Sequence, residues 1–253
     1  ILICLHKAYM FTKDKKKNKF KILLLHLHLF ENFQNYLKIL KVYKNSKILI
    51  TYRDPLVSIC STVKNWSKYD GGKHMTPRHL FMNYQFHFNI FNNLRDYKNK
   101  IRVIKLEKIH LESKKTMKKI CIFLNIKYSK SLLNSSYFGK KWWGDAISKK
   151  YLDGLNPNFE NKFDKEIFNN EELKFIENKI VDILIKYKYP IRSTVLNRVP
   201  KYYFPLFNLE KIFYSIVLKK LKMKTRLSIF FFYFQRLKLF KEKFLKKNLP
   251  NEI

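Results

Sequence analysis

Apolar and polar positions follow two different patterns along this chain. Short runs rich in Ile, Leu, Val and Phe are typical of buried strands, whereas apolar residues that recur every three or four positions are typical of amphipathic helices. The first pattern predicts strands at 20–30, 47–52 and 100–106. The second predicts helices at 32–43, 55–68, 77–97, 113–124 and 171–189. Because the strands alternate with helices, we expect an α/β fold with a parallel sheet.

Beyond Pro190 the pattern changes to long segments rich in Lys and Phe. We therefore divide the chain into an α/β domain at 1–190 and a basic, aromatic, helical extension at 191–253. The part of the extension at 211–247 has two interpretations. It is either a peripheral contact with an anionic membrane or a helical subdomain that packs its aromatic side chains on the core and turns Lys to water.

The formal net charge of the 253 residues is +34, which indicates an anionic partner. However, only eight of the 53 basic residues are Arg, the side chain that binds phosphates bidentately, and Lys is spread along the whole chain. No nucleic-acid-binding motif is present, so we do not expect a nucleic acid as partner. Apolar residues make up 46% of the chain, which argues against disorder.

The cysteines and the N-terminus bear on location. The three cysteines are widely spaced and fit neither a metal site nor a disulfide framework, so we expect a reducing, cytoplasmic compartment. The chain begins with Ile1, shows no signal peptide, and has no apolar run approaching the roughly 18 residues of a membrane-spanning helix. We interpret the N-terminus as the cut edge of a longer protein.

The stretch 48–66, ILITYRDPLVSICSTVKNW, combines a strand, a turn and a helix. Arg53 leaves the carboxyl end of a predicted parallel strand, where α/β folds bind ligands, and Ser61 follows eight residues later. If the helix folds back over the strand end, the Arg guanidinium and the Ser hydroxyl can donate to one phosphate. The alternative is an ion pair between Arg53 and Asp54 or a neighbour, with Ser61 exposed to solvent.

This arrangement resembles the 3′-phosphate-binding signature of the sulfotransferases that use 3′-phosphoadenosine-5′-phosphosulfate. Later segments continue in the order of that family, namely WSKYDGG (66–72), KIRVIKLEKIH (100–110), CIFLNI (121–126) and GKKWWGD (139–145). The resemblance implies a doubly wound parallel sheet of the P-loop nucleoside-triphosphatase-like type, with the phosphosulfate nucleotide as co-substrate and no metal.

The resemblance also implies which residues contact the nucleotide, namely Arg53, Ser61, Gly139, Lys140 and Lys141. An alternative for the two lysines is that they are ordinary loop charges in a Lys-rich protein. The family's loop for the 5′-phosphosulfate is missing, because no glycine precedes Gly71. Either this loop was lost with the missing N-terminus, which we favour, or the chain does not bind the donor in the normal way. In both cases we expect that this fragment by itself is inactive.

The family's catalytic histidine lies in a context resembling LLHLHLF (24–30), which implies that His28 is the general base. Two alternatives remain: His28 is a structural histidine at a strand end, or it forms a metal site with His26. Glu107 is expected to order the end of its strand instead of acting in catalysis.

The resulting hypothesis is transfer of a sulfuryl group to a hydroxyl or amine of an unknown acceptor, with a glycan or lipid-linked glycan preferred. The first alternative is a non-enzymatic basic protein bound to nucleic acid or to an anionic membrane surface. The second is a relative of the P-loop kinases, although the chain has no G-x-x-x-x-G-K-[ST] motif.

Overall fold

The computed structural model describes residues 33–68, 77–91, 94, 97, 99–134, 136–137, 140–141, 155–193, 205–219, 223–241 and 249–253. The predicted strand at 20–30, residues 69–76 and most of the GKKWWGD segment lie outside these residues.

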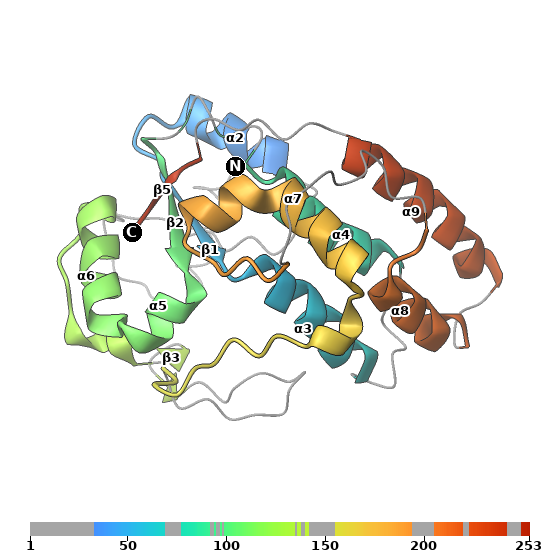
Figure 1. Cartoon of the computed structure of the whole chain (residues 1–253). Coiled ribbons are helices and arrows are strands. Elements are labelled where there is room, and N and C mark those ends of the chain that lie inside the picture. Colours follow the sequence, from blue (N-terminus) through green and yellow to red (C-terminus); the bar gives the residue numbers. More distant parts are fainter. Residues whose placement is uncertain are drawn as a thin grey trace.

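Three parallel strands form the sheet of the described part, in the order β1 (Ile48–Tyr52), β2 (Ile101–Lys105) and β5 (Asn251–Glu252). Tyr52 pairs with Lys105, so β1 and β2 end at the same edge of the sheet (Figure 1). The predicted α/β class and parallel sheet are therefore confirmed. A separate two-stranded antiparallel sheet joins β3 (Ser136–Tyr137) and β4 (Lys140–Lys141).

Helices make up most of the described chain, and two short 3-10 helices accompany them (Figure 1). The α-helices are α2 (Phe33–Val42), α3 (Pro55–Lys68), α4 (Pro77–Asn89), α5 (Leu106–Leu111), α6 (Ser113–Leu124), α7 (Asn170–Lys186), α8 (Asn208–Leu218) and α9 (Met223–Lys241). The 3-10 helices are η4 (Lys130–Leu133) and η5 (Lys165–Ile167). The bounds of α3 and α6 are those expected from the sequence.

Helix α4 is shorter than predicted, because it ends at Asn89 instead of continuing to residue 97. Beyond it the amide of Leu94 donates to Phe91 O and that of Tyr97 donates to Leu94 O. Ile90, Phe91 and Leu94 are nevertheless buried. The apolar spacing beyond Asn89 therefore indicated which residues are buried and did not indicate a helix. The Asn92-Asn93 pair in this stretch has a low helix propensity and favours turns.

One hydrophobic core joins the sheet to the helices. Tyr52 of β1 is surrounded by aromatic rings of α4, of the turn after it and of the segment around the end of α7, which are Phe86, His87, Phe91, Tyr187 and Tyr189. Burying one large apolar side chain stabilises a fold by about 1.5–3 kcal/mol. The free thiols of Cys60 and Cys121 are buried, and burial raises the pKa of Cys60 to about 12, which makes it an unreactive packing residue.

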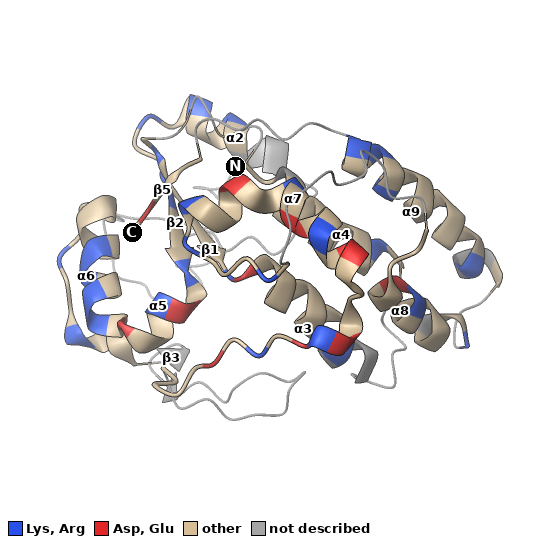
Figure 2. Ribbon diagram, in the orientation of Figure 1, with Lys and Arg blue, Asp and Glu red and all other residues tan. Residues whose placement is uncertain are grey.

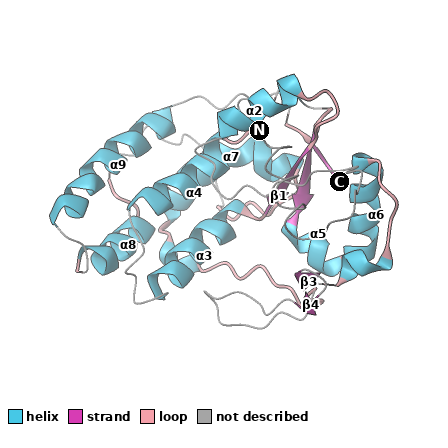
Figure 3. Cartoon of the chain, turned by 180° about the vertical axis from the view of Figure 1, so that it is seen from behind, coloured by secondary structure: helices cyan, strands magenta, loops and turns pink. Residues whose placement is uncertain are grey.

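The C-terminal helices share this core with the α/β part. Helix α9 packs on α4, and α8 packs on α3 (Figures 1 and 3). Phe207 and Phe240 lie in the same aromatic cluster as Tyr84 of α4. The last residues return to the sheet as β5, and Ile253 donates its amide to Val103 O. The boundary predicted at residue 190 therefore divides segments that pack together.

Candidate functional site at the carboxyl end of β1

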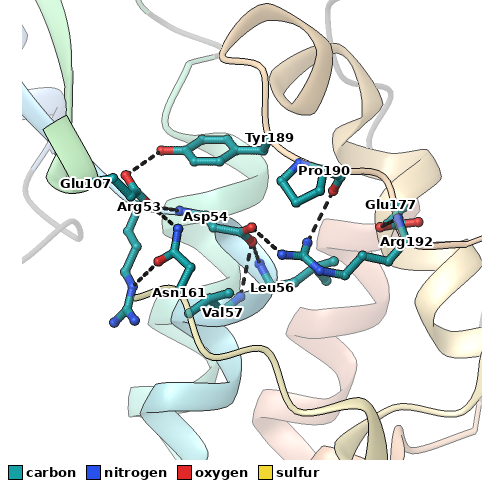
Figure 4. A network of polar contacts seen from close by, with 10 residues as sticks. All are labelled: Arg53, Asp54, Leu56, Val57, Glu107, Asn161, Glu177, Tyr189, Pro190 and Arg192. Atoms are coloured by element: carbon teal, nitrogen blue, oxygen red, sulfur yellow. Dashed lines mark hydrogen bonds and ion pairs between the residues drawn. The ribbon is translucent and has the colours of Figure 1, made fainter. Parts of the chain in front are cut away.

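Arg53 is the first residue beyond β1, at the edge of the sheet where α/β folds bind ligands. Its Nε donates to Oδ1 of Asn161 at 3.3 Å, and its guanidinium carbon lies 5.5 Å from the centre of the Phe159 ring. Within the described part of the chain, the two terminal nitrogens of Arg53 have no hydrogen bond or ion pair (Figure 4). The side chain is thus held at Nε while its fork stays available.

Asp54, the next residue, caps the N-terminus of α3 and is fully buried. Its Oδ1 accepts from the amides of Leu56 and Val57, at 3.0 and 3.2 Å. Its Oδ2 accepts from Nη2 of Arg192 at 2.6 Å (Figure 4). The predicted alternative of an Arg53–Asp54 ion pair is therefore wrong, because Arg192 takes that place.

Glu107, just past the end of β2, links this turn to its surroundings. Its Oε1 accepts from the amide of Asp54 at 3.2 Å and from Nδ2 of Asn161 at 2.7 Å. Its Oε2 accepts from the hydroxyl of Tyr189 at 3.4 Å. The prediction that Glu107 orders the strand end is confirmed. The carboxylates of Asp54 and Glu107 both accept hydrogen bonds from other groups, and neither forms an ion pair with the Arg53 guanidinium among the described residues.

The other cations at this edge of the sheet are engaged differently. Lys105 donates to Tyr187 O at 2.7 Å, and Lys108 lies 2.7 Å from a carboxylate oxygen of Glu252. Arg192 binds Asp54. Of these four side chains, Arg53 is the one that forms no ion pair with a carboxylate and donates no hydrogen bond to a main-chain carbonyl among the described residues. This difference marks it as the side chain suited to an external anion.

Ser61 lies in the second turn of α3 and is partly exposed. Lys64, which follows it by three positions and shares its side of the helix, forms an ion pair with Asp164. The segment 159–164 therefore contacts Arg53 through Asn161 and reaches α3 again beside Lys64. Ser61 lies one turn before Lys64, on the side of α3 that this segment reaches through Asp164.

The remaining predicted residues are placed only in part. His28 and Gly139 lie outside the described residues, as does His26 of the metal alternative. The backbone of Lys140 and Lys141 forms β4, opposite Tyr137 and Ser136 of β3. Figure 1 shows β3 on the side of the molecule that carries α5 and α6. Among the described residues no group of three His, Cys, Asp or Glu side chains could hold a metal ion.

His110 of α5 extends the site beyond Arg53. Its ring stacks on Phe159, with centroids 4.7 Å apart and planes 10° from parallel. Nδ1 of His110 accepts from the amide of Asn156 at 3.1 Å, which places the proton of a neutral ring on Nε2. Partial burial lowers the pKa of His110, against the opposing effect of Glu107. The residue is therefore an uncharged aromatic surface next to the arginine.

The sequence pattern missed three residues that shape the site, namely Phe159, Asn161 and Arg192. Phe159 and Asn161 lie in an irregular segment, and Arg192 follows α7 by a few residues, so no periodicity distinguishes them. Asp54 could have been recognised, because Asp directly before Pro at the start of a helix is a known N-cap pattern.

Comparisons of the chain with protein-family models, curated proteins and solved structures found no match. The likeness to sulfotransferases consequently depends on the motifs of this chain. The geometry itself supplies one oriented guanidinium at the end of β1 and a neutral aromatic stack beside it, a combination that can bind a phosphate attached to an aromatic base.

Proposed function

We propose that the carboxyl end of β1 binds the 3′-phosphate of 3′-phosphoadenosine-5′-phosphosulfate and that the protein is a sulfotransferase. The observation that carries this proposal is the state of Arg53, which is fixed through Nε by Asn161 while its two terminal nitrogens remain unpaired among the described residues. A guanidinium held in this way can donate two parallel hydrogen bonds to a phosphate without first breaking an ion pair.

The N-terminus of α3 explains why side chains are needed to bind the 3′-phosphate. The N-terminus of a helix commonly binds phosphate through its free amides. Here the amides of Leu56 and Val57 donate to Asp54 instead. The anion must therefore be held by side chains, which agrees with the roles proposed for Arg53 and Ser61, and with Lys140 and Lys141 as further contacts together with Gly139.

In the proposed reaction an acceptor hydroxyl or amine attacks the sulfur, the bond from sulfur to the phosphate oxygen breaks, and 3′-phosphoadenosine-5′-phosphate leaves. A base must take the acceptor's proton, and we assign this role to His28. We also propose that the three described strands belong to a doubly wound sheet of the P-loop-like type. The acceptor that we favour is a glycan or a lipid-linked glycan.

The test compares two nucleotides on the same set of variants. 3′-Phosphoadenosine-5′-phosphate carries the 3′-phosphate, and adenosine 5′-phosphate lacks it. Because a hydrogen bond to a charged group contributes about 1.5–3 kcal/mol, Arg53→Ala is expected to weaken binding of the first nucleotide by about 10- to 100-fold. Ser61→Ala is expected to weaken it by about tenfold, at the low end of this range, because its hydroxyl supplies one hydrogen bond to the phosphate and carries no charge. Neither variant changes the affinity for adenosine 5′-phosphate.

Lys114→Ala is the matched control, because it removes one positive charge from an exposed position of α6. It leaves both affinities unchanged if the contact is specific. Equal losses in Arg53→Ala and Lys114→Ala would indicate attraction by overall charge alone, as expected for a non-enzymatic basic protein, and affinity would then fall steeply with salt for any polyanion. Isothermal titration calorimetry at two salt concentrations separates these outcomes.

A further inference from the structure

Helix α9 exposes large apolar side chains on one side. We call this surface the α9 apolar face, and it consists of Met223, Leu227, Phe230, Phe231 and Phe234. Their exposed fractions are 79%, 61%, 66%, 59% and 65%. Proteins in aqueous solution seldom leave a contiguous group of such side chains uncovered without a use for it.

The spacing of these residues places them on a single side of the helix. They recur at intervals of three and four positions from Met223 to Phe234, whereas Arg236, Leu239 and Phe240 on the opposite side are buried against the core. On the opposite side of the first three turns, Ile229 packs against the core and the Phe232 ring contacts that of Phe81, so helix α9 is apolar on both sides there. A helix of this kind is normally covered on both sides, by protein or by lipid.

The surroundings of the α9 apolar face are cationic. Arg226 lies one position before Leu227 and is exposed, and the exposed Lys238 and Lys241 continue the same side of the helix beyond Phe234. The sequences of helices α3, α4, α8 and α9 contain a single carboxylate, Glu210. That carboxylate is buried, and Oε1 of Glu210 lies 2.6 Å from Nε of Arg236. Figure 2 shows α9 with basic positions and no acidic ones.

We propose that the α9 apolar face docks on the surface of an anionic lipid bilayer, with α9 lying parallel to the membrane plane. Apolar side chains that enter the boundary between headgroups and acyl chains release water, and each Lys or Arg near the surface adds about 1 kcal/mol of attraction to anionic lipids. No helix in the described part of the chain is long and apolar enough to cross a membrane, so α9 would lie in the interface.

The charge pattern favours lipid over a second copy of this chain. A symmetric contact through the α9 apolar face would bring the cations around one face against the same cations of the other copy, and like charges held close together oppose association. An anionic bilayer supplies an apolar layer and negative charge in one surface. An anionic bilayer can therefore bind both the basic and the apolar side chains of α9.

The position of α9 leaves the rest of the molecule free when it docks. Helix α9 contacts α4, and both views of the whole chain place it at the outer edge, on the far side of α4 from the sheet (Figures 1 and 3). Arg53 lies at the end of β1, on the inner side of that helical layer. This inference does not depend on the proposed nucleotide site, and either can fail alone.

The test is flotation of the full chain with vesicles of phosphatidylcholine alone or mixed with phosphatidylserine, at moderate salt. The triple variant Phe230→Ser, Phe231→Ser, Phe234→Ser removes apolar surface that is already exposed, so it is expected to fold. The control is Val42→Ser, Ile122→Ser, Ile185→Ser, which replaces three exposed apolar side chains of α2, α6 and α7. Circular dichroism confirms folding of both triple variants.

We expect the parent chain and the control to float with the anionic vesicles, and the Phe variant to bind about a hundredfold more weakly. Binding to phosphatidylcholine alone should be weaker for every form. The inference is overturned if the parent chain does not float or if the Phe variant floats as well as the control. It is also overturned if light scattering shows a lipid-free dimer of the parent chain that the Phe variant cannot form, because the face then serves self-association.

Discussion

Nη2 of Arg192 donates to Oδ2 of Asp54 at 2.6 Å, across 138 residues of sequence. This contact ties the segment after α7 to the turn between β1 and α3. The amides of Arg192 and Ser193 in turn donate to the two carboxylate oxygens of the buried Glu177, both at 2.7 Å. The turn that presents Arg53 is thus anchored to α7, which gives the candidate site a rigid base.

The first prediction concerns this anchor. Arg192→Met leaves the fully buried carboxylate of Asp54 without its cation, so we expect the free energy of unfolding to fall by about 3 kcal/mol. Urea titration followed by circular dichroism measures the change. In the double variant Arg192→Met, Asp54→Asn the buried charge is gone while an oxygen remains to cap α3, so we expect about half of the loss to be recovered. Equal stability of the single and double variants would contradict this role of Arg192.

A second prediction concerns Asn161, which connects Arg53 to Glu107. Because Asn161 is exposed, its replacement by Ala should change the free energy of unfolding by less than about 0.5 kcal/mol. The guanidinium of Arg53 then loses its fixed orientation, and we expect the affinity for 3′-phosphoadenosine-5′-phosphate to fall by about fivefold. The affinity for adenosine 5′-phosphate should not change.

The control for Asn161 is Asn158→Ala, an exposed asparagine of the same irregular segment. Its side chain does not contact Arg53 or Glu107 in the described structure. If Asn158→Ala and Asn161→Ala reduce the nucleotide affinity equally, the effect belongs to the whole segment, and Asn161 does not orient Arg53.

The third prediction is a pH dependence of stability that arises at His87. This side chain is buried in α4 with its Nδ1 3.2 Å from the hydroxyl of Tyr52, and burial lowers its pKa from 6.5 to about 3. Between these two values the unfolded chain binds a proton that the folded chain excludes. His87 therefore contributes stability that is fully present above pH 6.5 and is lost, at about 1.4 kcal/mol per pH unit, as the pH falls toward 3.

Denaturant titrations of the parent chain and of His87→Asn between pH 7 and pH 4.5 test this contribution. The variant cannot titrate at this position, so its stability should fall less steeply with decreasing pH, by about 1.4 kcal/mol per unit below pH 6. Carboxylates elsewhere affect both proteins alike and cancel in the difference. Parallel curves for the two proteins would show that His87 takes up its proton in the folded state.

The sequence by itself determined the elements whose signals are local. Helix α3 begins at Pro55 and α6 ends at Leu124, as the pattern predicted, because a proline in a first turn and the apolar spacing act within a few positions of the chain. The same local pattern placed Arg53 at the carboxyl end of a parallel strand. It also identified α9 as basic and aromatic without deciding whether its aromatic side would be covered.

Only the tertiary structure decided how these elements meet. It ended α4 at Asn89, returned the last residues to the sheet as β5, and brought Asn161 and Arg192 to the turn beside Arg53. The Arg53–Asn161 contact joins residues 108 positions apart, and the Asp54–Arg192 contact joins residues 138 positions apart. No periodicity in the sequence indicates which distant side chain will pair with a buried carboxylate or orient a guanidinium. The availability of Arg53 is therefore a property of the fold, because it depends on Arg192 taking Asp54 in its place.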